Sequence, residues 1–189
     1  MLKSLALPAL LALIAVGGAA PAAAQQAGTP EQFALEYMAA TRASDWRRVA
    51  DMMHPDALAE FKEMFGTIAA IDTTGEVLSN LFGVADSAAY AATSPDSIYV
   101  SFMKTMVNLS PELGEALSGS EAKPIGHVEE KETGLTHVLF RMRVQVQGVT
   151  ISQVDVIPLK RHDGRWRAVL TGEMEGMAQA LKQQLGRGM

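Results

Sequence analysis

The chain has 189 residues, with 16 Lys and Arg against 21 Asp and Glu, which gives a formal net charge of −5. This mild acidic excess works against binding to nucleic acid, which needs a concentrated basic surface to neutralise phosphates. The sequence contains no cysteine, so disulfide bonds and lipid attachment through a cysteine are both excluded.

The first 24 residues have the pattern of a secretory signal peptide. Lys3 supplies a positive charge, residues 5–16 are mostly apolar, and residues 21–24 offer the small side chains that signal peptidase reads. An uncleaved membrane anchor is disfavoured, because the apolar run is shorter than the roughly 20 residues that cross a bilayer. We therefore expect cleavage near Gln25, a periplasmic or secreted protein without a stable membrane anchor, a flexible leader over residues 25–28, and one domain over residues 29–189.

Helical patterns fill the first part of this domain. Thr29 and Pro30 form a start signal that predicts a helix over residues 30–42. Ser44 and Asp45 predict a second helix, which ends at Pro55, and Asp56 is expected to cap a third helical segment. Residues 66–93 are expected to form a helical insertion over one end of the core, rather than a mobile lid, because their apolar side chains would be costly to leave in water.

A further helix and a sheet follow. Residues 95–109 predict a helix with a wide apolar face that includes Leu109, and residues 111–117 predict a brief one. Strand patterns cover residues 125–131, 135–146, 149–161 and 165–170, with turn signals at residues 147–148 and 163–164. The expected fold is α+β, with N-terminal helices packed on a bent, cone-like four-stranded antiparallel meander. An amphipathic segment after residue 170 predicts a C-terminal helix.

The expected two-residue turns fix which side chains share a face of the sheet. Pairing Val146 with Val149 places Asp155 opposite Phe140, on a face that is otherwise mostly apolar. The opposite face mixes charged residues with aliphatic ones, which is typical of a partner surface. We expect it to form a homodimer interface, and the aliphatic residues expected to carry that interface are Leu139, Val154, Val156 and Val169.

The order of these elements resembles the nuclear transport factor 2-like superfamily, which includes ketosteroid-isomerase-like and polyketide-cyclase-like proteins. The local cues are Asp45-Trp46 and the run from His54 to Leu58, and the resemblance covers residues 30–171. It departs from the common pattern in residues 66–93, where the family usually has a short strand. It implies a cone that encloses an apolar pocket, with a pocket carboxylate as the base in catalytic members. The residues expected around that pocket are Gln153, Phe140, Met142, Trp166, Tyr37, Trp46 and Tyr99.

Asp155 is the residue that best fits the role of this base, because the strand register places it on the apolar face independently of the resemblance. A carboxylate in an apolar site has a raised proton affinity and can act near neutral pH. Alternatively, Asp155 binds a helix N-terminus, Gln153 or an arginine, or a bulge turns it outward. The favoured hypothesis is a non-catalytic protein that binds a small apolar ligand or a protein partner; the alternative is an isomerase- or cyclase-type enzyme.

Other chemistry has little support in the sequence. The four histidines contain no pair at i, i+4 and have no cysteine partner, so we expect no metal site; they are His54, His127, His137 and His162. A three-residue first hairpin turn would set His127 and His137 diagonally on adjacent strands and would point Val128 inward. A G-x-S-x-G motif and a glycine-rich phosphate loop are both missing, and we expect no cofactor.

Overall fold

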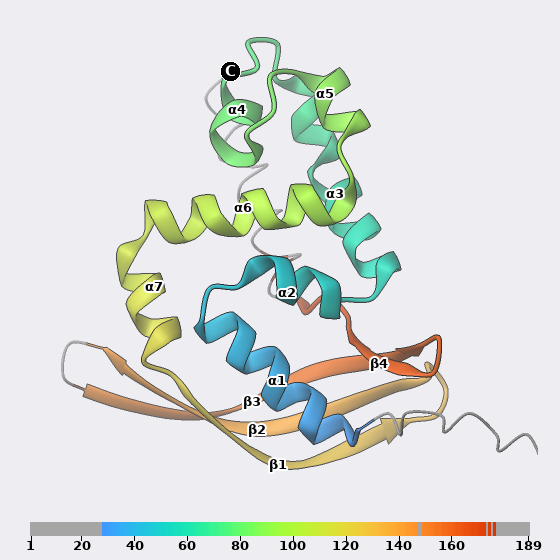
Figure 1. The fold of residues 1–189 in the computed structure, drawn as a ribbon, viewed down its shortest axis with the longest axis vertical. Coiled ribbons are helices and arrows are strands. Elements are labelled where there is room, and N and C mark those ends of the chain that lie inside the picture. The colour runs from blue at the N-terminus through green and yellow to red at the C-terminus, as the bar shows by residue number, and fades with distance from the viewer. Residues whose placement is uncertain (1–27, 147–148, 173, 175, 177–189) are drawn as a thin grey trace, which may run out of the picture.

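The computed structural model describes residues 28–146, 149–172, 174 and 176. The expected signal peptide, most of the leader, the turn at residues 147–148 and nearly all of the expected C-terminal helix lie outside the described residues. The described chain has the predicted α+β fold, in which helices α1 to α7 precede a four-stranded antiparallel sheet with strand order β1-β2-β3-β4 (Figure 1). Within the described part, no helix is both long and apolar enough to cross a membrane.

Several of the helices begin at residues whose side chains accept hydrogen bonds from free backbone amides. The helices are α1 (Pro30–Arg42), α2 (Trp46–Met52), α3 (Pro55–Ile71), α4 (Glu76–Phe82), α5 (Ser87–Ala92), α6 (Pro95–Leu109) and α7 (Pro111–Ser118). Thr29 and Gln32 complete the expected capping box of α1, and Asp45 accepts a hydrogen bond from the Arg48 amide at the start of α2. The predicted cap of the third helix is wrong, because His54 Nδ1 accepts the Asp56 amide and thereby caps α3 itself.

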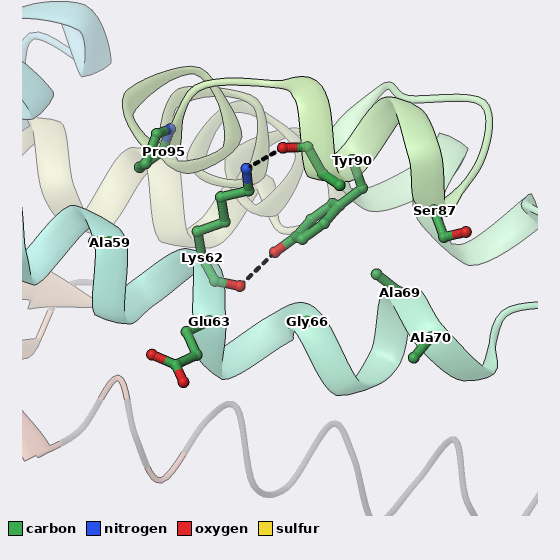
Figure 2. Close-up of a pocket in the computed structure, with 10 residues that line it drawn as sticks. Ala59, Lys62, Glu63, Gly66, Ala69, Ala70, Ser87, Tyr90 and Pro95 are labelled. Carbon is green, nitrogen blue, oxygen red and sulfur yellow. Dashed lines mark hydrogen bonds between the residues drawn. The ribbon is translucent and has the colours of Figure 1, made fainter.

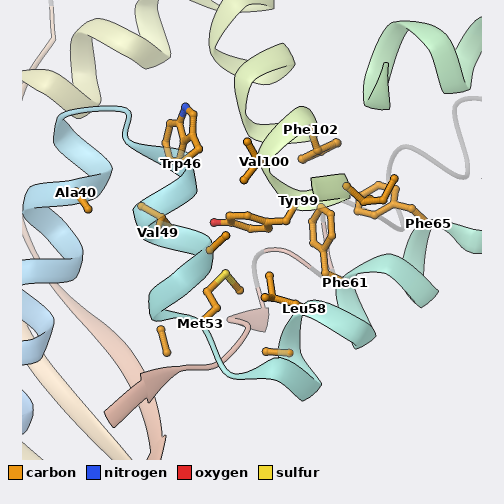
Figure 3. Close-up of a cluster of buried hydrophobic side chains, with 14 of the residues drawn as sticks. Ala40, Trp46, Val49, Met53, Leu58, Phe61, Phe65, Tyr99, Val100 and Phe102 are labelled. Carbon is orange, nitrogen blue, oxygen red and sulfur yellow. The ribbon is translucent and has the colours of Figure 1, made fainter. Parts of the chain in front are cut away.

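The core lies between α2, α3, α4 and α6 and extends to the concave face of the sheet. Phe61, Phe65 and Phe102 are fully buried and contact one another, with ring centroids 4.9–5.4 Å apart (Figure 3). Such aromatic contacts add to the free energy gained by removing the rings from water. Leu109 departs from the prediction, since it lies exposed at the last turn of α6.

Residues 66–93 contain the end of α3 and the two short helices α4 and α5. Asp72 follows α3, and its carboxylate accepts hydrogen bonds from the amides of Gly75 and Leu78 at the start of α4. Leu78, Phe82 and Tyr90 are buried and belong to the same hydrophobic cluster as the aromatic residues of α3 and α6. This segment therefore contributes directly to the core.

The sheet contains β1 (Glu121–Glu130), β2 (Leu135–Val146), β3 (Val149–His162) and β4 (Arg165–Ala168). The predicted pairing of β2 with β3 is confirmed, from Val146 opposite Val149 to Val138 opposite Ile157, and so is that of β3 with β4. The prediction for the first strand is wrong at its start, because β1 begins at Glu121 and includes Pro124. Proline is tolerated there because β1 is an edge strand, and its pairing with β2 is irregular between Pro124 and Gly126.

The first hairpin also differs from the prediction. Glu130 pairs with Leu135, so four residues connect β1 to β2, and Val128 lies opposite His137 on the convex face with 58% of its surface exposed. Helices α1 and α2 lie over the concave face, and no helix of the described chain covers the convex face (Figure 1). We call this convex side, with its alternating residues of β1, β2 and β3, the outer face.

Candidate functional site

Asp155 lies on the concave side of β3, opposite Phe140, as the strand register predicts. It is half-buried, and its Oδ1 accepts a hydrogen bond from the Val156 amide at 2.8 Å. The carboxylate is therefore engaged by the backbone next to it.

The position of the Val156 amide explains this bond. β4 pairs only with residues 159–162 of β3, so no strand of the described chain lies beside the preceding part of β3 on that side. The Pro158 carbonyl accepts a hydrogen bond from the Val169 amide, so it points away from β2. Backbone groups two residues apart on a strand point to the same side, so the Val156 amide also points to this open edge. Asp155 thus satisfies an exposed edge amide, and an inward-pointing charge on an edge strand is also a common protection against pairing with another chain.

The hollows found among the described residues are lined by other side chains than those expected around an apolar pocket. Trp46, Tyr99 and Phe140 are buried in the hydrophobic core, and Tyr37 and Met142 pack against it. Gln153 is exposed. Trp166 is half-buried at the sheet edge, where its Nε1 donates to the Gly28 carbonyl and its ring lies 4.1 Å from the Arg161 guanidinium carbon. Burial raises the pKa of Tyr37 and of Tyr99 above its ordinary value, so both hydroxyls stay protonated near neutral pH.

A large hollow of about 520 Å³ lies instead between α3 and α5 (Figure 2). Its wall is mainly of small and apolar residues, among them Ala59, Gly66 and Ala69. Two of its polar residues are held by the backbone: Lys62 Nζ donates to the carbonyls of Ala91 and Thr93, and the Tyr90 hydroxyl donates to the Lys62 carbonyl at 2.8 Å. Glu63 and Ser87 also line the hollow.

Burial raises the pKa of Tyr90 to about 12, which removes it as an acid or base at neutral pH. The lysine and the tyrosine of this hollow therefore join α3 to α5.

The histidines take part in separate local contacts. His54 is buried, and burial lowers its pKa; its ring contacts that of His162 edge to face. His127 Nδ1 lies 2.6 Å from Glu31 Oε1, and His137 Nε2 lies 2.9 Å from Glu130 Oε2. These hydrogen bonds lower the pKa of both glutamates. Nowhere in the described ranges do three His, Asp or Glu side chains come together as metal ligands.

The outer face presents a group of aliphatic side chains at its centre. Leu139 lies opposite Val156 on adjacent strands, and Val154 lies one pleat further along β3, beside Arg141. The exposed fractions of Val154 and Val156 are 52% and 38%, and Leu139 is half-buried. Val169 differs from these three, because it follows β4 and packs against the core.

A second feature of the outer face escaped sequence reasoning. Arg141 and Arg143 are among the charged residues that strand alternation predicts for this face, whereas the sequence gives no sign that Lys123 and Arg42 lie near them. Lys123 becomes the cross-strand partner of Arg141 only because β1 extends past Pro124 to Glu121. The four cationic residues border one hollow of about 370 Å³. Four cationic residues around one hollow are suited to an anion.

No protein-family model matches the chain, and neither a curated protein nor a solved structure is similar enough to count as a match. The residues themselves therefore carry the functional argument.

Proposed function

We propose that this chain is a non-catalytic binding protein of the periplasm or the extracellular space, and that it associates as a homodimer through the outer face of its sheet. The observation that supports this proposal is the aliphatic group on three adjacent strands, formed by Val128, Leu139, Val154 and Val156. Contiguous exposed apolar groups of this kind are typical of interaction surfaces. A second copy related by a two-fold axis presents the same group in return, so the contact is self-complementary.

The area of the outer face limits the affinity that we expect for the dimer. Three strands spaced about 4.8 Å apart and about 12 residues long cover at most roughly 600 Å², and this area includes the end that carries Lys123, Arg141 and Arg143. This is below the roughly 800 Å² that each partner buries in a standard interface, so we expect a dissociation constant in the micromolar range.

The enzyme alternative uses Asp155 as a general base, and the hydrogen bond from the Val156 amide weighs against it, because that carboxylate already has a partner in the neighbouring backbone. The order of helical hairpin, buried helix and closing meander supports membership of the nuclear transport factor 2-like superfamily, which we retain as part of the proposal. In that family an apolar pocket binds small ligands. Here the hollow between α3 and α5 has the volume of a ligand site, and we assign any small apolar ligand to it.

Sedimentation velocity on residues 25–189 tests the dimer. The double variant Val154→Gln/Val156→Gln keeps the net charge and removes exposed aliphatic surface from both copies. At about 1 kcal/mol for each half-exposed valine, four side chains contribute about 4 kcal/mol, and Gln retains part of this, so the dissociation constant should rise at least about tenfold.

Val149→Gln is the matched control. Val149 lies on the same strand and is 63% exposed, but its side chain belongs to the concave side. It should leave the dissociation constant unchanged. A protein that is monomeric at about 100 µM, or a control that weakens the dimer as much as the double variant, would contradict the proposal.

A further inference from the structure

A concentrated group of cations lies beside the start of β1, at one end of the sheet. Arg42, Lys123, Arg141 and Arg143 line the hollow of about 370 Å³ together with Glu121 and Ala122. A second hollow of about 420 Å³ shares Glu121 and Arg143 and adds the polar side chains of Gln145 and Thr150. We call the first hollow, with its four cationic residues and Glu121, the basic hollow.

Two structural elements bring these charges together. The β1–β2 pairing sets Lys123 directly opposite Arg141, and Glu121 opposite Arg143. Arg42 comes from the last turn of α1, and its Nη1 donates to the Ser120 carbonyl at 3.2 Å, just before β1 begins. A guanidinium has five N–H donors, so this single bond fixes the position of Arg42 and leaves most of its donors for another group.

The basic hollow does not stabilise the fold by itself. Like charges directly opposite each other on adjacent strands are destabilising. Among the described residues, none of the four cationic side chains forms a salt bridge with a carboxylate. A bound anion would offset the repulsion between Lys123 and Arg141.

Acidic and basic residues are distributed unevenly between the helices and the sheet. Residues 28–120, which form the helices, contain five Lys and Arg against 13 Asp and Glu. Residues 121–168, which form the sheet, contain eight Lys and Arg against six Asp and Glu. The cationic group on the sheet therefore stands out from an acidic protein, which repels anions elsewhere and favours them here.

We propose that the basic hollow is a binding site for a phosphoryl group, carried either by inorganic phosphate or by a small phosphate monoester. Three guanidinium groups and one ammonium group around one carboxylate give a net charge of +3, which suits a multiply charged oxyanion better than a single carboxylate. Arginine matches the geometry of phosphate oxygens through paired N–H donors, and the ammonium of Lys123 adds a point charge. The four cationic residues are exposed to solvent, so the affinity is modest and decreases with salt.

Isothermal titration calorimetry of residues 25–189 at constant ionic strength tests the proposal, with inorganic phosphate, glycerol phosphate and acetate as probes. We expect phosphate to bind with a dissociation constant of about 1 mM or lower, and acetate at least about tenfold more weakly. Tighter binding of glycerol phosphate than of inorganic phosphate would assign the site to a monoester, and the reverse would assign it to the free ion.

Arg141→Gln should weaken phosphate binding about tenfold, because it removes the guanidinium between Lys123 and Arg143. Arg165→Gln is the matched control, since it removes the same charge from an exposed position on β4, outside the hollow, and should leave binding unchanged. Equal binding of phosphate and acetate, or equal loss in the two variants, would overturn the proposal. A monomeric protein that binds phosphate would support this site while contradicting the proposed dimer.

Discussion

Replacing Phe82 by alanine tests whether residues 66–93 belong to the core or form a separate lid. Phe82 lies in α4 with 2% of its surface exposed, and its ring centroid is 5.5 Å from that of Phe65, 5.2 Å from that of Tyr90 and 5.8 Å from that of Phe102. It therefore joins α4 to α3, α5 and α6 at one point.

The loss of stability expected for Phe82→Ala follows from the burial of this ring among other aromatic rings. Truncating a fully buried phenylalanine to alanine removes about 3–5 kcal/mol from the free energy of unfolding, because the transfer free energy of the ring is lost and a cavity remains. Three aromatic partners around the ring place Phe82→Ala in the upper part of this range. For a lid that opens independently of the core, the same substitution would cost less than about 1 kcal/mol in global stability.

Urea unfolding of residues 25–189, followed by circular dichroism, measures the difference. Leu109→Ala is the control, because Leu109 is 69% exposed at the end of α6 and should change stability by no more than about 0.5 kcal/mol. A loss below about 1.5 kcal/mol for Phe82→Ala, with an unchanged slope of free energy against urea, would refute the placement of this segment in the core.

Two further predictions concern the start of α4. Gly75 has φ +73°, and an added Cβ would overlap the Ala85 carbonyl oxygen, whereas Gly83 has a similar φ of +67° and open space around it. In urea unfolding, Gly75→Ala should therefore cost at least about 1 kcal/mol more than Gly83→Ala, and equal costs would contradict the close contact. The amides of Leu78 and Gly75 and the Thr74 hydroxyl hold the pKa of Asp72 below its ordinary value of 3.8. A carboxyl with a lowered pKa in the folded protein stabilises it fully above the unfolded pKa, and this contribution is lost as the pH falls through the folded pKa. Asp72→Asn should thus lower the Tm at pH 7, whereas at about pH 2 the variant and the unchanged protein should have nearly the same Tm. A difference in Tm that stays constant across that pH range would contradict the role of the Asp72 charge.

The order of the elements and the central register could be predicted from the sequence because both depend on local chemistry. The alternation of β2 and β3 and the two short turn signals are enough to pair Phe140 with Asp155, as the structure has them. The same holds for the cap at Thr29, whose partner Gln32 is three residues away. Interactions between residues that are close together in the sequence, or on strands joined by a short turn, can be predicted from the sequence alone.

The errors occurred where the outcome depends on a neighbouring element. Pro124 indicates the end of a strand, yet it is accommodated because β1 is the outermost strand of the sheet that the described residues form. Asp56 is a common capping residue, but His54 takes that role at the start of α3 and is itself buried against His162. The basic hollow needs the pairing of Lys123 with Arg141 and the return of α1 to the start of β1, and neither contact follows from sequence spacing.

The sequence and the structure lead to different interpretations of Asp155. Alternation places a carboxylate on an apolar face, and in a closed cone such a group would be desolvated and basic. The shortness of β4, which pairs with only four residues of β3, opens the sheet edge beside Asp155, and the Val156 amide at that edge becomes its partner. An acid that has a structural partner at an open edge has less need of a catalytic role to explain its position. On the outer face, cationic and aliphatic residues lie side by side. Of all parts of the molecule, this face has the composition that the requirements of folding explain least.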